Sequence, residues 1–167
     1  MINNEENLLA LYLEEINRIP LLTREEEDSI ARKALDGDSL AKEKLITSNL
    51  RFVVNVAKKY RNNGIPFEDL INEGNLGLMT AVDKFDPDKG YHFISYAVWW
   101  IRQSILKAVC EKSRSIRLPL NRANELVQIQ KTQREISRVT GEVVDAKEVA
   151  AILGMDTNKV KELVEIS

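Results

Sequence analysis

The chain has 167 residues, of which 44% are hydrophobic and 30% are charged, with a formal net charge of −2. These values are typical of a globular protein, and no apolar run approaches the roughly 18 residues of a membrane-spanning helix. Cys110 and His92 are the only cysteine and histidine, so a disulfide, a Cys/His metal site and histidine-based catalysis lack the residues they need. The first residues also lack the basic and apolar segments of a signal peptide. We therefore expect a cytoplasmic protein that is not an enzyme and uses no cofactor.

Charge is unevenly distributed along the chain. Residues 1–50 carry six Lys or Arg against eleven Asp or Glu, whereas residues 99–122 carry six Lys or Arg against Glu111 alone. Residues 51–64, which include Lys58, add four basic residues and no acid. Such concentrated basic segments are expected of a protein that binds nucleic acid, although a solvated charged surface would also explain them.

Helix signals dominate the sequence, and strand signals are nearly absent. Thr23-Arg-Glu-Glu26 predicts a capping box at the start of a helix. Asp36-Gly-Asp38, Asn62-Asn-Gly64 and Asp86-Pro-Asp-Lys-Gly90 each place Gly where a helix ends or a turn needs positive φ. We therefore predict an all-α protein with five or more helices before residue 112.

A helix is predicted from Gly64 to about Phe85, with Pro66 in its first turn. Its apolar residues recur at helical spacing and define a buried face, which consists of Phe67, Leu70, Ile71, Gly74, Leu78, Ala81, Val82 and Phe85. The opposite face is mixed and consists of Asp69, Asn72, Glu73, Leu76, Met79 and Asp83. An apolar centre with a polar rim suits contact with a protein that bears Arg residues, although single exposed Leu and Met residues are also common on ordinary surfaces.

Residues 91–100 hold five of the ten aromatic residues of the chain. At about 100° per residue, a helix that starts near Phe93 has two distinct faces. The predicted core face is aliphatic and consists of Ile94, Ala97, Val98, Ile101, Ile105 and Ala108. The second face consists of Phe93, Tyr96, Trp100, Gln103 and Lys107. Rings beside cations and amides suit a single-stranded nucleic acid, because bases stack on rings and phosphates pair with cations. A second core stripe is the alternative.

Two helical domains are predicted, residues 1–112 and residues 113–167. The segment 113–121 contains Pro119 and resembles a linker or a rigid entry to the next helix. Residues 121–139 then form the first helix of a three-helix unit.

The last two helices of this unit flank Gly154. Asp145-Ala-Lys-Glu148 predicts a second capping box. The stretch 148–163 resembles a helix-turn-helix, a motif that binds DNA in some proteins and only packs or dimerises in others.

Four ordered blocks of the sequence resemble conserved regions 2.1 to 2.4 of the bacterial sigma-70 family. They are residues 49–60, 69–79, 81–85 and 96–103. Residues 12–27 are similar to region 1.2, and the segment from Arg114 onward is similar to region 3. The similarity covers nearly the whole chain in order, which makes it far more specific than a short motif.

The resemblance implies a promoter-recognition subunit that joins core RNA polymerase and melts promoter DNA. The residues that it implies for binding the clamp coiled coil of the polymerase beta-prime subunit are Asp69, Asn72, Glu73, Asn75, Leu76 and Met79. Those that it implies for capturing the non-template strand of the minus-ten element are Tyr91, Phe93, Ser95, Tyr96, Trp99 and Trp100. Tyr96 would stack on a flipped adenine.

Further DNA contacts are implied around this set. Residues expected near the flipped bases or at the last paired position are Asn49, Phe85, Lys89 and Gln103. Residues expected to contribute positive charge to DNA binding are Lys58, Arg102, Lys107, Arg114 and Arg117. Stacking of about 1 to 3 kcal/mol per base can offset the few kcal/mol that flipping a base costs, so melting here would be binding rather than chemistry.

The sequence departs from the common family pattern in two places. Many members have Lys, Ser, Thr and Thr at the positions of His92, Ile94, Val98 and Leu106. Members that read an extended minus-ten motif have His and Glu at the positions of Asn121 and Asn124. These departures favour an alternative factor over the principal one. Because no region 4 follows region 3 here, and no acidic region 1.1 precedes residue 5, we expect a fragment of a longer protein without self-inhibition by region 1.1.

Two other hypotheses remain open from the sequence. One is a helix-turn-helix repressor that binds duplex operators without polymerase. The other is a protein that occupies polymerase without melting DNA, or an anti-sigma factor. An anti-sigma factor is also a candidate partner under the leading hypothesis, whereas a membrane is not.

Overall fold

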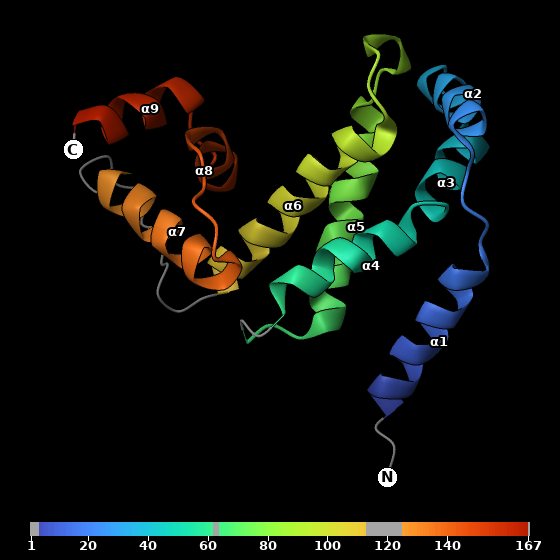
Figure 1. The fold of residues 1–167 in the computed structure, drawn as a ribbon, viewed down its shortest axis with the longest axis horizontal. Helices are drawn as coiled ribbons and strands as arrows, with labels where there is room; N and C mark the ends of the chain where they lie inside the picture. The colour runs from blue at the N-terminus through green and yellow to red at the C-terminus, as the bar shows by residue number, and fades with distance from the viewer. Residues whose placement is uncertain (1–3, 62–63, 113–124, 167) are drawn as a thin grey trace.

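The computed structural model describes residues 4–61, 64–112 and 125–166, and within these ranges the chain has nine α-helices and no strand (Figure 1). The all-α prediction is confirmed. The first four helices are α1 (Asn4–Arg18), α2 (Arg24–Leu35), α3 (Ser39–Thr47) and α4 (Leu50–Ala57). They are followed by the 3-10 turn η1 (Lys58–Tyr60), α5 (Phe67–Lys84), the 3-10 turn η2 (Pro87–Lys89) and α6 (Phe93–Lys112). The last three are α7 (Glu125–Thr140), α8 (Ala146–Leu153) and α9 (Thr157–Ile166).

The predicted capping box and two of the predicted glycine turns are confirmed, whereas α5 begins at Phe67, with Pro66 as its N-cap rather than in its first turn. The Thr23 hydroxyl accepts from the Glu26 amide at 3.2 Å, and the Glu26 carboxylate accepts from the Thr23 amide at the same distance. Gly37 and Gly90 adopt φ values of 95° and 85°, the left-handed region that favours glycine. Asn62 and Asn63 lie outside the described residues.

Helices α5 and α6 pack against each other along their lengths and form the centre of the fold (Figure 1). The predicted buried face of α5 is confirmed from Leu70 to Phe85, whereas Phe67 is half-buried. The two helices approach each other closely at Gly77. A Cβ atom there would lie 2.5 Å from the Trp100 carbonyl oxygen and 2.9 Å from Ile101 Cα. Only glycine permits this separation, because real Cβ atoms do not approach backbone so closely.

The two predicted faces of α6 are wrong in part. Phe93 is fully buried and Ile94 is 44% exposed, which reverses the expected placement. Phe85 follows the last turn of α5 and packs edge-on against Phe93, with 5.2 Å between ring centroids. This contact turns the first residue of α6 inward.

Gln103 also belongs to the predicted exposed face and is buried. The physical reason is that α6 is covered on two sides, by α4 and α5 on one side and by α7 and α8 on the other (Figure 1). Leu106, which neither predicted face included, is fully buried for the same reason. A helix packed between two units buries more than one stripe of residues.

The predicted three-helix C-terminal unit is confirmed as α7, α8 and α9. Gly154 ends α8 with φ 69°, as the predicted turn requires. Asp145 caps α8 by accepting from the Glu148 amide at 2.9 Å. The Glu148 carboxylate instead forms an ion pair with Arg102 of α6. The predicted linker over residues 113–121 lies outside the described residues.

Helix α2 supports the segment that leads into α6. Arg32 of α2 donates to Asp88 of η2 at 2.7 Å. Glu27 of α2 lies against the Phe93 amide at the start of α6, and burial raises the pKa of this carboxyl although that amide and His92 act to lower it. The start of α6 is therefore held from a part of the chain that is distant in sequence.

None of the described helices has both the length and the apolar composition that crossing a membrane requires. The described residues also contain no group of three or more His, Cys, Asp or Glu side chains arranged to hold a metal ion.

Candidate nucleic-acid and protein interfaces

Five rings form a connected cluster, here named the aromatic platform, which consists of Phe85, Tyr91, Tyr96, Trp99 and Trp100. Tyr91 and Tyr96 are stacked, with 5.7 Å between ring centroids and 16° between ring planes. Tyr96 lies 6.2 Å from Trp100, and Trp99 meets Trp100 edge-on at 5.0 Å. The rings come from the end of α5, the segment before α6 and the first two turns of α6.

Phe85 forms the floor of this platform. It is 5% exposed, whereas Tyr91 is 45% exposed. The Phe85 ring lies 5.6 Å from the Tyr96 ring and 6.0 Å from the Tyr91 ring. The surface rings therefore rest on buried rings, which restricts their rotation before any ligand arrives.

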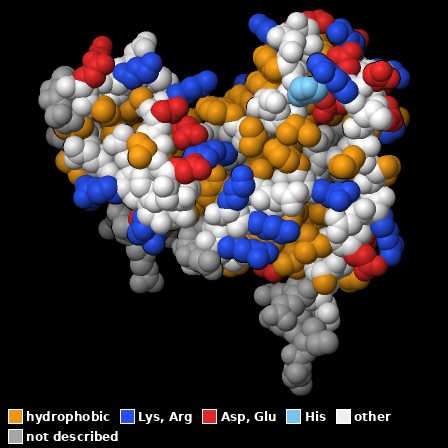
Figure 2. Space-filling view, in the orientation of Figure 1, with side chains coloured by type: hydrophobic (Ala, Val, Ile, Leu, Met, Phe, Trp, Pro, Cys, Tyr) orange, Lys and Arg blue, Asp and Glu red, His pale blue; other side chains and the backbone are white. Residues whose placement is uncertain are grey.

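An open cavity of about 580 Å³ lies against the platform. Its lining residues are Tyr91, Ser95, Tyr96, Trp99, Trp100 and Lys147. Flat apolar ring faces, a hydroxyl and an ammonium group suit a ligand that combines aromatic bases with negative charge. Figure 2 shows hydrophobic side chains gathered on one face of the molecule, with Lys and Arg side chains spread below them.

Two lysines that the sequence analysis missed flank the tryptophan pair. Lys84 Nζ lies 5.5 Å from the Trp100 ring centroid, and Lys147 Nζ lies 5.2 Å from the Trp99 ring centroid. Lys84 directly precedes Phe85, so its nearness to the platform could have been inferred from the sequence. Lys147 lies in α8, and no local pattern connects it with α6.

Several residues predicted to contact DNA lie beneath the surface. Phe93 packs under the platform against Phe85. Asn49 is 7% exposed, and its side-chain amide donates to the Leu45 carbonyl at 2.7 Å. Gln103 is also 7% exposed, and neither its amide nitrogen nor its amide oxygen has a partner among the described residues. The structure therefore does not bring these three side chains to the cavity.

The remaining predicted DNA contacts are dispersed. Lys58 in η1, Lys89 in η2 and Lys107 in α6 are exposed, but none of them lines the cavity. Arg114 and Arg117 lie outside the described residues.

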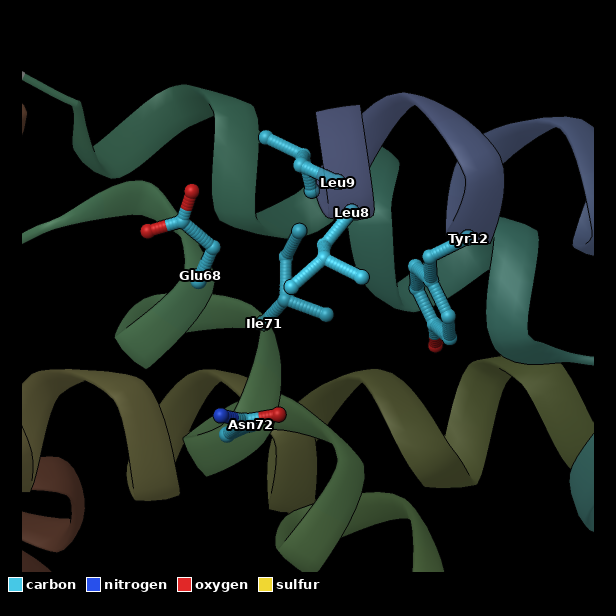
Figure 3. A pocket seen from close by; sticks show the side chains of 6 residues that line it. All are labelled: Leu8, Leu9, Tyr12, Glu68, Ile71 and Asn72. Carbon is cyan, nitrogen blue, oxygen red and sulfur yellow. The ribbon is translucent and has the colours of Figure 1, made fainter. Parts of the chain in front are cut away.

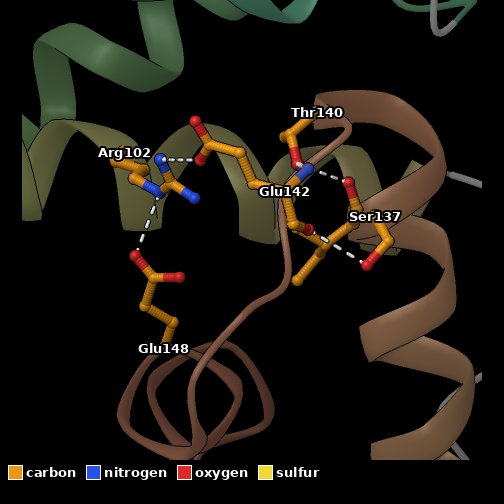
Figure 4. Close-up of polar contacts among 6 residues, drawn as sticks. Arg102, Ser137, Thr140, Glu142 and Glu148 are labelled. Carbon is orange, nitrogen blue, oxygen red and sulfur yellow. Dashed lines mark hydrogen bonds and ion pairs between the residues drawn. The ribbon is translucent and has the colours of Figure 1, made fainter.

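Arg102, which was predicted to contact phosphate, pairs with two carboxylates in this structure. Its Nη1 donates to Glu142 Oε2 at 3.0 Å, and its Nε lies 3.0 Å from Glu148 Oε1 (Figure 4). The side chain is only 22% exposed. The guanidinium therefore joins α6 to the C-terminal unit, and a phosphate that reached it would compete with two carboxylates.

At this contact, burial and the neighbouring charges shift the pKa values of Arg102 and Glu148 in opposite directions. Burial acts to lower the pKa of Arg102, but Tyr60 and the two carboxylates together raise it, so the guanidinium stays charged. Burial raises the pKa of Glu148, although Arg102 acts to lower it. Burial likewise raises the pKa of the Tyr60 phenol. The ion pairs are thus formed at a partly desolvated junction.

The outer face of α5, here meaning Asp69, Asn72, Glu73, Leu76, Met79 and Asp83, is exposed at four of its six residues. Leu76 is 56% exposed and Met79 is 47% exposed. Asn72 and Asp83 are exposed, whereas Asp69 and Glu73 are half-buried. Asn75, also predicted to bind a protein, is half-buried, and its amide donates to the Tyr12 hydroxyl of α1 at 3.3 Å.

A groove between α1 and α5 adjoins this outer face. Its lining consists of Leu8, Leu9, Tyr12, Glu68, Ile71 and Asn72 (Figure 3). Leu8 is 66% exposed, so α1 contributes apolar surface that the sequence analysis did not assign. Asn72 belongs to both the groove and the outer face, which makes the two surfaces continuous.

Comparisons with known proteins give a consistent result. The family model for sigma-70 factor region 1.2 matches residues 7–40, and the model for sigma-70 region 2 matches residues 45–115. The RNA polymerase sigma factor SigA of Clostridium acetobutylicum is 42% identical over 159 residues, which are 95% of this chain. A SigA protein of a Bacillus species is 40% identical over the same share. The chain spans 42% of the length of each of these relatives.

Proposed function

Because this chain belongs to the bacterial sigma-70 family, we propose that it binds core RNA polymerase and captures the minus-ten non-template strand during transcription initiation. The two activities use different surfaces, the outer face of α5 for polymerase and the aromatic platform for DNA. Both surfaces belong to residues 1–112, which we propose as one domain, with residues 113–167 as a second domain.

The observation that carries the DNA proposal is the stacked and supported arrangement of Tyr91 and Tyr96 beside the open cavity. Bases that leave the duplex lose stacking on their neighbours and regain it on these rings. Each stacked base returns about 1 to 3 kcal/mol, so two or three captured bases offset much of the cost of opening the duplex. Lys84 and Lys147 add positive charge at the edges of the tryptophan pair.

The polymerase proposal rests on the composition and exposure of the outer face of α5. Leu76 and Met79 give it an apolar centre, and carboxylates and amides surround them. This arrangement suits a basic helical partner such as the clamp coiled coil of the beta-prime subunit, because apolar contact contributes affinity while charged rim contacts orient the partner.

Substitution of Tyr96 tests the division between the two surfaces. The chain is assembled with bacterial core polymerase, and binding of a labelled single strand that carries a minus-ten element is measured. Tyr96→Ala should weaken strand binding about 5- to 150-fold, the equivalent of one lost stacking contact. Tyr96→Phe keeps the ring and should bind nearly as the unchanged chain does.

Polymerase binding and strand separation are measured on the same variants. Tyr96→Ala should retain polymerase binding and should lower the reactivity of minus-ten thymines toward a reagent specific for unpaired bases. Equal loss of polymerase binding and strand binding would refute the division of surfaces. A preference for duplex over single strand would favour the repressor hypothesis.

A further inference from the structure

The C-terminal unit contributes a side chain to the cavity of the aromatic platform. Lys147 lies in the first turn of α8 and lines this cavity together with residues from the start of α6. Its ammonium group sits 5.2 Å from the Trp99 ring centroid. The cavity is therefore composite, with rings from one unit and a cation from the other.

The position of Lys147 is fixed by its neighbour in the chain. Glu148 forms an ion pair with Arg102 at 3.0 Å, one helical turn beyond Trp99 on α6. Glu142, in the turn before α8, pairs with the same guanidinium at 3.0 Å. The two contacts attach the start of α8 to α6 beside the tryptophan pair.

The turn that carries Glu142 is itself held in place by α7 (Figure 4). The Glu142 amide donates to the Thr140 hydroxyl at 3.1 Å, and the Glu142 carbonyl accepts from the Ser137 hydroxyl at 3.0 Å. Gly141 adopts φ 72° and makes this tight turn possible. These contacts hold the backbone of Glu142, whose carboxylate pairs with Arg102.

The Lys147 ammonium keeps an uncompensated positive charge. The residue is exposed, and among the described residues it forms no ion pair, in contrast to Arg102, Arg138 and Lys159. A tryptophan face orients a cation but does not neutralise it. An anion placed in the cavity beside stacked bases would complete the site, and the phosphate of the captured strand is such an anion.

We propose that Lys147 binds a backbone phosphate of the single strand held on the aromatic platform, and that the Arg102–Glu148 ion pair is the positioning element that presents it. This inference rests on the proposed capture of the minus-ten strand. It makes the C-terminal unit part of the single-strand site rather than only a neighbour of it.

The test measures strand affinity against salt concentration, with the chain assembled on bacterial core polymerase and a labelled minus-ten oligonucleotide as the probe. Loss of one phosphate contact lowers the magnitude of the slope of log affinity against log salt by about 0.7 for a single strand. Lys147→Ala should show this change and bind about fivefold more weakly at 0.1 M salt. Lys147→Arg should keep the slope.

A matched control separates a local contact from a general loss of positive charge. Lys161 is an exposed lysine of α9 outside the cavity. Lys161→Ala removes the same charge and should leave the slope unchanged. An equal effect of Lys161→Ala and Lys147→Ala would overturn the inference, and so would an unchanged slope in Lys147→Ala.

Glu148→Gln tests the positioning role, because charge and geometry predict opposite results. If only the removal of a negative charge mattered, Glu148→Gln would strengthen DNA binding. If Glu148 positions Lys147, the substitution should release α8 and weaken binding about two- to fivefold, where the upper value corresponds to the full loss of one phosphate contact. Addition of Lys147→Ala to Glu148→Gln should then cause little further loss, since both act through one contact. Tighter binding by Glu148→Gln would refute the positioning role.

The outcome for Tyr96→Ala distinguishes this inference from the proposed function. If Tyr96→Ala weakens strand binding and Lys147→Ala does not, the inference fails and the proposed function stands. If neither substitution affects strand binding, the proposed function fails as well.

Discussion

The outer face of α5 and the aromatic platform are built in different ways. The outer face lies along one helix, and its exposed residues recur at the spacing of that helix. The platform combines the end of α5, the segment before α6 and the start of α6, and α8 adds a lysine at its edge. A surface on one helix needs only that helix to be placed, whereas a composite surface requires several packed elements to hold their relative positions.

Both surfaces depend on the close contact of α5 with α6, so the largest expected effect follows from disturbing that contact. Gly77→Ala should lower the free energy of unfolding by about 2 to 3 kcal/mol, because the added Cβ meets the backbone of Trp100 and Ile101 and α5 must shift. Urea denaturation measures this change. Single-strand binding and polymerase binding should both decrease.

Gly74→Ala provides a graded comparison. A Cβ atom there would meet side-chain atoms of Val53, Ile105 and Ile101 rather than backbone. Side chains can move with less effect on the helices, so the loss of stability should be smaller than for Gly77→Ala. If Gly77→Ala were as stable as the unchanged chain, the close approach of α5 and α6 at Gly77 would be contradicted.

The next effect should separate the two surfaces. Leu76→Asp places a charge at the apolar centre of the outer face of α5 and should weaken polymerase binding at least about tenfold, which is about 1.4 kcal/mol. Competition between labelled and unlabelled chains for core polymerase measures this change. At saturating polymerase, strand capture by the assembled complex should be unaffected.

Leu40→Asp is the matched control for this substitution. Leu40 is 76% exposed in α3 and lies outside both surfaces. Its replacement should leave polymerase binding unchanged. Similar losses in the two variants would show that added negative charge, rather than the outer face of α5, determines the result.

The smallest effect concerns the junction that positions α8. Because burial raises the pKa of Glu148 above its ordinary value of 4.5, the folded chain binds this proton more tightly than the unfolded chain. The contribution of Glu148 to stability is therefore most favourable below pH 4.5 and declines as the pH rises through the raised pKa. Glu148→Gln should remove this decline.

Urea denaturation of the unchanged chain and of Glu148→Gln, each between pH 4 and pH 7, isolates the contribution of Glu148. The other titrating groups are the same in the two proteins. Parallel pH profiles would show that the carboxyl is not desolvated at this junction. The expected small size of the effect agrees with a role in orientation, because a partly buried ion pair gains little net stability.

Local sequence signals predicted much of the fold. The Thr23 capping box, the left-handed Gly37 and Gly154, and the buried stripe of α5 all follow from interactions within a few residues, and the structure confirms them. The exposed positions of Leu76 and Met79 follow from the same helical period.

The faces of α6 could not be predicted in this way. Helical angles assign residues to faces, but they do not say how many faces are covered. Phe93 turned inward because Phe85 packs on it, and Gln103 became buried in a helix that packs against two units. Arg102 has the positive charge expected of a DNA contact, yet it forms ion pairs with two carboxylates that lie 40 and 46 residues further along the chain.

The sequence by itself determined the family, the helices, the outer face of α5 and the concentration of rings between residues 91 and 100, because each depends on residue order and local spacing. Only the tertiary structure decided which rings reach the surface, that Arg102 joins α6 to the C-terminal unit and that Lys147 lines the cavity beside the platform. These features depend on contacts between distant segments, and such contacts exist only once α5, α6 and α8 have packed.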